Sequence, residues 1–231
     1  MTIRSTFIAL PAAVLFCSFL PSDDCNVYGP TKKGMVLEYK QFNAKDKPEG
    51  TTRMTVLDVK ETGGATTIQM QSEVTDRKDK PVGSSTYELR CENGSFFLDM
   101  QSMVSAEQKA AFKDMKLDVQ ANKLDIPANP SAGTALKDGT LSMKGAAEGS
   151  PFGFNLTTKI TNRKVAAVED ITVPAGTYKA IKLTYDVETK FMVTTRGKAA
   201  EWYVKDLGMV RSETYDKNDQ LLGYMVLQSV K

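Results

Sequence analysis

The sequence predicts a mainly β protein in which about eleven strands form an antiparallel sheet. Between residues 181 and 193, apolar and polar side chains alternate with a period of two, as in a strand with one buried and one solvated face. At roughly 3.3 Å per residue this segment would span about 40 Å, so we expect it to bend or bulge. Gly63-Gly64 and Asn93-Gly94 separate other alternating segments and are typical hairpin turns. The 231 residues, 41% of them hydrophobic, fit one large all-β domain.

The expected strands follow one another with short turns between them, which indicates meanders. We place strands at residues 35–40, 53–61, 65–76, 84–91, 95–100, 140–144, 152–161, 164–169 and 181–193, with further strand segments between 201 and 227. The sharpest turn is Val173-Pro-Ala-Gly176, because proline presets φ and glycine accepts positive φ. Polar turns at 195–198 and 216–219 connect the last strands into a second meander.

One short helix is predicted at residues 106–115. Ser105 can cap its start, and Gln108 three positions later completes a capping box. The helix is about three turns long and marginal on its own. We therefore expect Phe112 and Met115 to lie against the sheet.

Residues 1–22 have the features of a secretory signal peptide. Arg4 precedes an apolar run over residues 7–20, which has the length of a signal core and is short for a bilayer span. Cleavage near Ser22 would leave residues 23–231 as a single β-rich domain. We expect this domain to be exported to the periplasm or to the outer membrane, with no transmembrane span.

Two cysteines, Cys25 and Cys91, remain after removal of the signal. A disulfide between them would close a loop of about 66 residues and stabilise the fold by roughly 4 kcal/mol. The alternative is that Cys91 is a small buried hydrophobic residue on the inner face of its strand. A lipoprotein start at Cys17 or Cys25 is less favoured, because neither cysteine follows a small residue.

The residue types present argue against several classes of function. The balance of 30 basic and 28 acidic residues, without a basic stripe, argues against nucleic-acid binding. The sequence contains no histidine, which removes an imidazole base and an ordinary zinc site. Asp186 and Glu188 lie on the polar face of a strand, where carboxylates are usually solvated. We expect no catalytic residues, metal or cofactor, and so a protein that is not an enzyme.

Four motifs carry a family resemblance: Ile171-Thr-Val-Pro-Ala-Gly-Thr-Tyr178, Glu201-Trp-Tyr203, Leu207-Gly-Met-Val-Arg-Ser-Glu213, and Asp23-Asp-Cys25 with Cys91-Glu-Asn-Gly94. Together they resemble the TapB-like family of exported proteins from Gram-negative bacteria, and more remotely the LolA and LolB lipoprotein carriers. The resemblance implies a single curved, half-open sheet with a short helix over its concave side. In the carriers that side holds acyl chains.

Two functional hypotheses follow. In the first, the protein binds an apolar ligand, an acyl chain or a lipoprotein segment, on the concave face of the sheet. The groove would be lined by Phe112, Met115, Phe154, Tyr185, Phe191 and Trp202. The methionines spread along the chain suit such a groove, although they also fill ordinary cores. In the second hypothesis the core is filled, and the protein is an envelope structural or protein-interaction domain.

Overall fold

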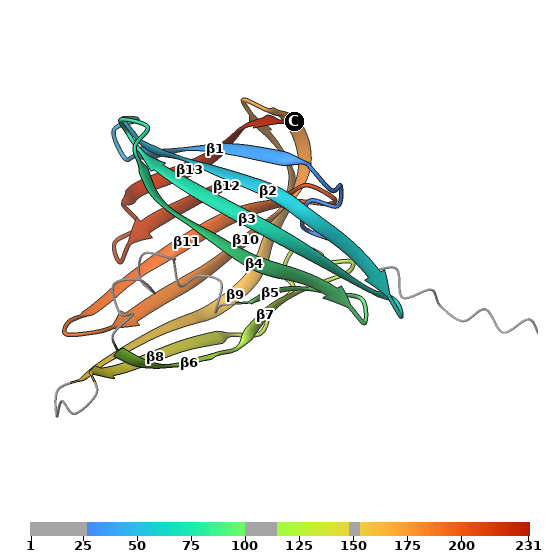
Figure 1. Ribbon diagram of the computed structural model, residues 1–231. Helices are drawn as coiled ribbons and strands as arrows, with labels where there is room; N and C mark the ends of the chain where they lie inside the picture. Colours follow the sequence, from blue (N-terminus) through green and yellow to red (C-terminus); the bar gives the residue numbers. More distant parts are fainter. Residues whose placement is uncertain (1–26, 100–114, 148–152) are drawn as a thin grey trace, which may run out of the picture.

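The computed structural model describes residues 27–99, 115–147 and 153–231 (Figure 1). These residues form a 13-stranded antiparallel sheet in the order β6-β8-β9-β10-β11-β12-β13-β1-β2-β3-β4-β5-β7. The strands are β1 (Val36–Asn43), β2 (Pro48–Thr62), β3 (Ala65–Asp76), β4 (Pro81–Glu92), β5 (Ser95–Asp99), β6 (Met115–Ala121), β7 (Lys123–Pro127), β8 (Gly139–Ala147), β9 (Gly153–Val173), β10 (Gly176–Lys190), β11 (Thr194–Val204), β12 (Gly208–Asp216) and β13 (Leu221–Val230). The sheet curls into a nearly closed barrel shape, which confirms the expected mainly β class and single curved sheet.

Several details of the expected fold differ from the structure. The described residues form 13 strands rather than about eleven. Residues 195–198, expected as a turn, belong to strand β11, and the connection that precedes this strand is at residues 191–193. No helix occurs in the described residues, and the expected helix at 106–115 falls almost wholly outside them. Its last residue, Met115, begins strand β6 instead. The expected strands at 152–161 and 164–169 are parts of the single 21-residue strand β9.

The bulge expected in the segment 181–193 lies instead in the neighbouring strand, β9. Thr184 of β10 pairs with Lys164, and Asp186 pairs with Thr161, so Asn162 and Arg163 together face a single residue of β10. Asn162 has a φ of 55°, which accommodates the extra residue. The bulge re-aims the Arg163 side chain, which is only 4% exposed.

The two edges of the sheet come from one continuous segment of the chain. Strand β6 pairs with β8 at one edge, β7 pairs with β5 at the other, and Asn122 alone separates them. The Asn122 amide donates to the carbonyl of Thr140 at 3.0 Å, and the Asn122 Oδ1 atom accepts from the Thr140 amide at 3.1 Å. The chain therefore crosses from one edge of the sheet to the other at Asn122, and both edge strands belong to one continuous segment.

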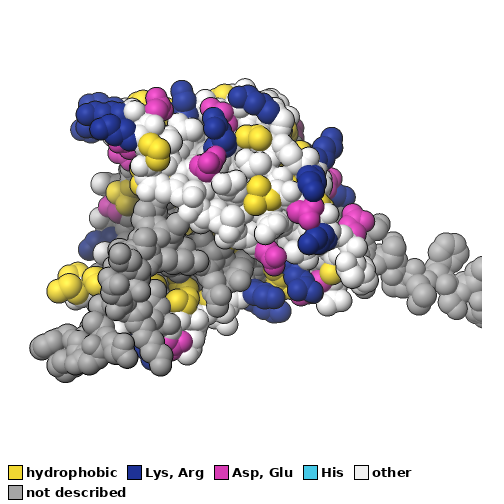
Figure 2. All heavy atoms as spheres, in the orientation of Figure 1, with side chains coloured by type: hydrophobic (Ala, Val, Ile, Leu, Met, Phe, Trp, Pro, Cys, Tyr) yellow, Lys and Arg dark blue, Asp and Glu magenta, His cyan; other side chains and the backbone are white. Residues whose placement is uncertain are grey.

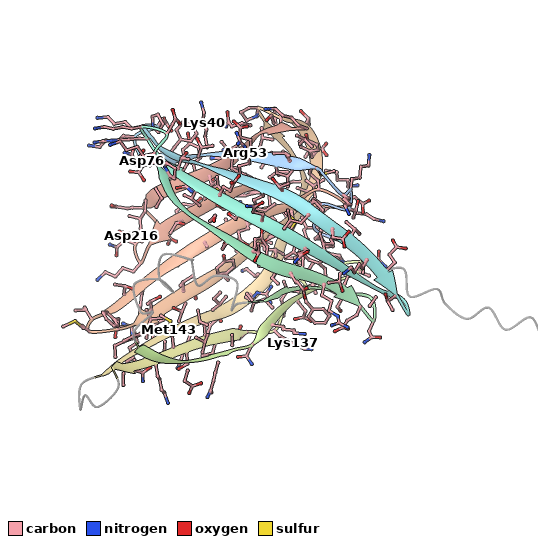
Figure 3. All side chains as sticks on the ribbon, viewed as in Figure 1. Lys40, Arg53, Asp76, Lys137, Met143 and Asp216 are labelled. Atoms are coloured by element: carbon pink, nitrogen blue, oxygen red, sulfur yellow. The ribbon has the colours of Figure 1, made fainter. Side chains whose placement is uncertain are left out.

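Arg163 joins the two sides of this seam. Its guanidinium donates from Nη1 to the carbonyl of Lys137 at 2.7 Å and from Nη2 to the carbonyl of Asp125 in β7 at 3.2 Å. Lys137 belongs to the segment between β7 and β8 and lies near the seam in Figure 3. The segment itself runs along β9, where the Leu136 amide donates to the carbonyl of Arg163. At the seam, the Arg163 side chain therefore makes hydrogen bonds to backbone carbonyls on both sides.

The outer face of the sheet is covered where the β9–β10 hairpin curls back over the last strands. The Ala175 amide at its corner donates to the carbonyl of Leu227 in β13 at 3.4 Å. Val173, Trp202 and Val226 are buried in the resulting cluster. This explains why β13 is apolar on both faces. By contrast, Lys40 and Arg53 extend from β1 and β2 toward solvent (Figure 3).

Candidate functional site

A small apolar cavity lies inside the barrel. Its volume is about 110 Å³. It is lined by Tyr28, Gly29, Pro30, Leu37, Tyr39, Met54, Met70, Tyr87, Leu89, Phe96, Leu98, Tyr203, Leu207, Gly208 and Met209. The N-terminal segment at Tyr28 thus faces strands β1 to β5 on one side and β11 and β12 on the other.

Methionine and tyrosine side chains shape this cavity. Met54, Met70 and Met209 all contribute to its wall. The Tyr87 hydroxyl lies 3.5 Å from the Met54 sulfur, and the Tyr39 hydroxyl donates to the carbonyl of Met209 at 2.8 Å. The walls combine adaptable thioether side chains with tyrosines fixed by hydrogen bonds.

A polar cluster adjoins the cavity at Tyr203. The Tyr185 hydroxyl donates to one Glu201 carboxylate oxygen at 2.8 Å, and the Tyr203 hydroxyl donates to the other at 3.0 Å. Burial raises the pKa of Glu201, while the two tyrosine hydrogen bonds and the nearby charge of Arg163 act in the opposite direction. Burial also raises the pKa values of Tyr185 and Tyr203 well above 10.0. Both phenols therefore stay neutral donors.

Arg163 and Asp125 extend this polar cluster to the seam. Burial lowers the pKa of Arg163, and the carboxylate of Asp125 is the largest influence that opposes this change. One Asp125 oxygen lies 3.8 Å from the Lys137 ammonium. The other, Oδ1, is buried and accepts no hydrogen bond from the described residues. The cluster offers carboxylate and phenol groups for hydrogen bonding beside an apolar space.

The structure brings together three of the residues that the sequence predicted for a ligand groove. Phe154 and Tyr185 belong to one cluster on the inner face, and the Phe154 and Phe191 rings meet edge to face with centroids 6.1 Å apart. Trp202 lies apart from them on the outer face, because its neighbours Glu201 and Tyr203 point inward. Its indole donates to Glu169 at 2.7 Å.

The structure describes the other predicted groove residues and the two cysteines only in part. Phe112, Cys25 and the side chain of Met115 lie outside the described parts of the chain. Cys91 is completely buried, in agreement with its inner-face position. The pairing of Cys25 with Cys91 stays a prediction.

Sequence reasoning missed Arg163, Glu201 and Asp125. The sequence did contain one signal for Arg163. The inward-facing apolar residues of β9 have even numbers up to Ile160 and an odd number at Val165. Such a change of parity indicates a bulge. Glu201 carried no comparable signal, since polar residues on a strand are normally assigned to the solvent face.

Two kinds of feature are absent from the described residues. Within residues 27–99, 115–147 and 153–231, no three His, Cys, Asp or Glu side chains are grouped so that they could hold a metal ion. The same part of the chain has no helix long and apolar enough to cross a membrane.

Comparison with known proteins assigns the family. The DUF3108-like family model matches residues 32–227. The chain belongs to the DUF3108-like family. This match does not bear out the narrower TapB-like resemblance or the relation to the LolA and LolB carriers. No curated protein sequence matches the chain.

Two solved structures share the fold of this DUF3108-like protein. One, from Bacteroides fragilis, is described as a candidate exported protein with a YmcC-like fold; it is 22% identical, with a TM-score of 0.72. The other, from Parabacteroides distasonis, is described as a candidate lipoprotein; it is 26% identical, with a TM-score of 0.74. Each alignment covers 90% of this chain and 100% of the other.

Proposed function

We propose that this DUF3108-like protein is an exported, non-enzymatic binding protein that takes an apolar group, from an acyl chain or a lipoprotein segment, into its inner cavity. The observation that carries the proposal is the apolar cavity beside the Tyr185–Glu201–Tyr203 cluster. Export is supported by the signal-like residues 1–22 and by the descriptions of the two structural neighbours.

The size of the cavity limits what it can hold. Sites for drug-sized ligands usually measure about 300–1,000 Å³, whereas this cavity measures about 110 Å³. It therefore suits the end of a chain rather than a whole lipid. Methionine side chains can move to enlarge such a space, because they have three rotatable bonds and no branch.

A binding role is favoured over catalysis by how Glu201 is held. Both of its carboxylate oxygens accept hydrogen bonds from tyrosines, so it is positioned as a fixed acceptor. A general acid or base needs a free proton-transfer position toward its substrate. The absence of histidine from the sequence also removes the residue most often used for that task.

A second candidate is an envelope structural or protein-interaction domain without a small ligand. The small volume of the cavity favours this alternative, because side chains already fill most of the barrel interior and leave little room for a ligand. In that case the partner would be another envelope protein.

A cavity-filling variant distinguishes the two functions. A fluorescent palmitate analogue is titrated into the purified protein, into Met54→Trp, which fills the cavity, and into Val82→Trp. The control places the same side chain at a position on β4 that is 49% exposed. The binding proposal expects saturable binding by the wild type and the control, and binding at least about tenfold weaker for Met54→Trp.

Overpacking a core costs about 1–3 kcal/mol, so circular dichroism is used to check that each variant is folded. Absence of saturable palmitate binding, together with no lipid mass in native mass spectrometry of the protein from its own envelope, would overturn the proposal in favour of the second candidate. Equal binding by both tryptophan variants would place the ligand outside this cavity.

A further inference from the structure

The connection between β10 and β11 exposes three consecutive hydrophobic residues. Phe191, Met192 and Val193 are 48%, 88% and 74% exposed. They form the free end of the hairpin, and Figure 2 shows hydrophobic side chains projecting at this corner of the molecule. Such a projection of apolar surface into water needs an explanation.

The turn itself does not require these residues. Other hairpin turns of this protein use polar residues with positive φ, namely Asp46, Asp79, Asn93 and Asp219. Asn and Asp suit such positions because they tolerate left-handed backbone and bond to nearby amides. At the β10–β11 turn, the Phe191 amide donates to the carbonyl of Val193 at 3.3 Å, a contact that any side chain permits.

The packing of the core explains only one of the three side chains. The Phe191 ring meets the Phe154 ring edge to face, with centroids 6.1 Å apart, and so fixes the base of the tip on β9. Met192 and Val193 are the most exposed large hydrophobic residues in the described part of the chain. Packing within the described part of the chain therefore does not account for their apolar character.

Several lysines lie on one face of the sheet beside this tip. Lys144, Lys159 and Lys190 are exposed, and the pairing of β8, β9 and β10 places them on the same outer face. None of them forms an ion pair with a described residue. Arg196 adds a fourth cation, which pairs with Glu188 at 2.7 Å. Asp118 is exposed and lies opposite Lys144 on the same face, so four cations stand against the two carboxylates of Asp118 and Glu188. A positive excess remains beside the hydrophobic tip.

We propose that the β10–β11 tip docks on the surface of an anionic lipid bilayer. Met192 and Val193 would reach the boundary between the headgroups and the acyl chains, while Lys144, Lys159 and Lys190 contact anionic headgroups. A hairpin end can do this without breaking strand pairing, since its backbone bonds are already made within the hairpin. A protein partner is less suited, because a stable interface buries about 800 Å² per partner, far more than three side chains supply.

The test measures the depth of the tip in the membrane. Met192→Trp and the control Val82→Trp each add one tryptophan to the buried Trp202. Each protein is mixed with phosphatidylethanolamine–phosphatidylglycerol vesicles that contain brominated lipid, which quenches tryptophan only on contact with the acyl region. We expect quenching of the added tryptophan in Met192→Trp and none in Val82→Trp. This quenching reports the position of the tip itself, so the result can be interpreted even if another part of the chain also binds the membrane.

Binding variants complete the test. Met192→Asp is expected to weaken co-sedimentation with the same vesicles by about tenfold or more. Lys190→Glu is expected to weaken it on the order of tenfold, while neutral phosphatidylcholine vesicles bind poorly. Equal quenching of both tryptophan variants, or none at all, would overturn the proposal. A wild-type dimer that Met192→Asp converts to a monomer would also overturn it, since the tip would then serve self-association. The inference holds whether or not the inner cavity takes a ligand.

Discussion

Replacement of Arg163 by methionine should open the seam of the barrel. The change removes two hydrogen bonds, to the carbonyls of Lys137 and Asp125 at 2.7 and 3.2 Å. Each carbonyl left without a donor costs about 1–3 kcal/mol. Removal of the buried charge returns part of this, because burial of a guanidinium is itself unfavourable. We expect a net loss of about 3 kcal/mol in the free energy of unfolding.

Urea and thermal unfolding, followed through the fluorescence of Trp202, measure this loss. Trp202 is the single tryptophan and is 6% exposed in the folded protein. For a chain of this length, about 3 kcal/mol should lower the midpoint of thermal unfolding by about 6–12 °C. The control is Arg196→Met, in which the lost ion pair with Glu188 involves a side chain that is 66% exposed and should cost less than about 1 kcal/mol. If the two variants lost equal stability, Arg163 would not hold the seam.

Three further predictions concern other positions. Burial raises the pKa of Glu201 above its ordinary 4.5, so the folded protein favours the protonated form of this side chain. The stability that this preference contributes is fully present below about pH 4.5 and is lost as the pH rises through the folded-state pKa. Glu201→Gln should therefore gain stability relative to the wild type between about pH 4 and about pH 7 in urea unfolding, and a constant difference would contradict this. Gly223→Ala would place a Cβ 2.7 Å from the carbonyl oxygen of Phe42 and should cost about 1–3 kcal/mol in thermal unfolding, whereas Leu222→Ala, at a position that is 55% exposed, should change little. A Cys25–Cys91 disulfide would make the intact mass lighter by two hydrogens, and its reduction should lower the free energy of unfolding by roughly 4 kcal/mol; an unchanged mass on reduction would exclude it.

Local patterns predicted most of the strands and several of the turns, although residues 195–198, expected as a turn, are part of β11. The turn at 216–219 follows from its own side chain, since the Asp216 carboxylate accepts from the amides of Asn218 and Gln220 at 2.8 and 2.9 Å. The alternation in 181–193 correctly predicted a strand, although β10 ends at Lys190. The alternation continues through Phe191 and Val193, but these residues lie at the exposed end of the hairpin and not in the strand.

The candidate site was harder to predict because it depends on contacts between distant parts of the chain. Glu201 meets Tyr185 from the neighbouring strand, and Arg163 reaches Asp125, which is 38 positions away in the sequence. The sequence analysis placed Trp202 in a groove on the concave face and assigned no role to Glu201. The structure places Trp202 on the outer face, where the curled β9–β10 hairpin provides an apolar cover.

The sequence by itself determined the mainly β class, most strand positions and several of the hairpin turns, because these depend on side-chain alternation and on backbone preferences within a few residues. Only the tertiary structure decided where the sheet bulges, how β6 and β7 close the seam, and which side chains enclose the cavity. Those features depend on pairing between strands far apart in sequence, where a shift of one residue moves a side chain from one face to the other.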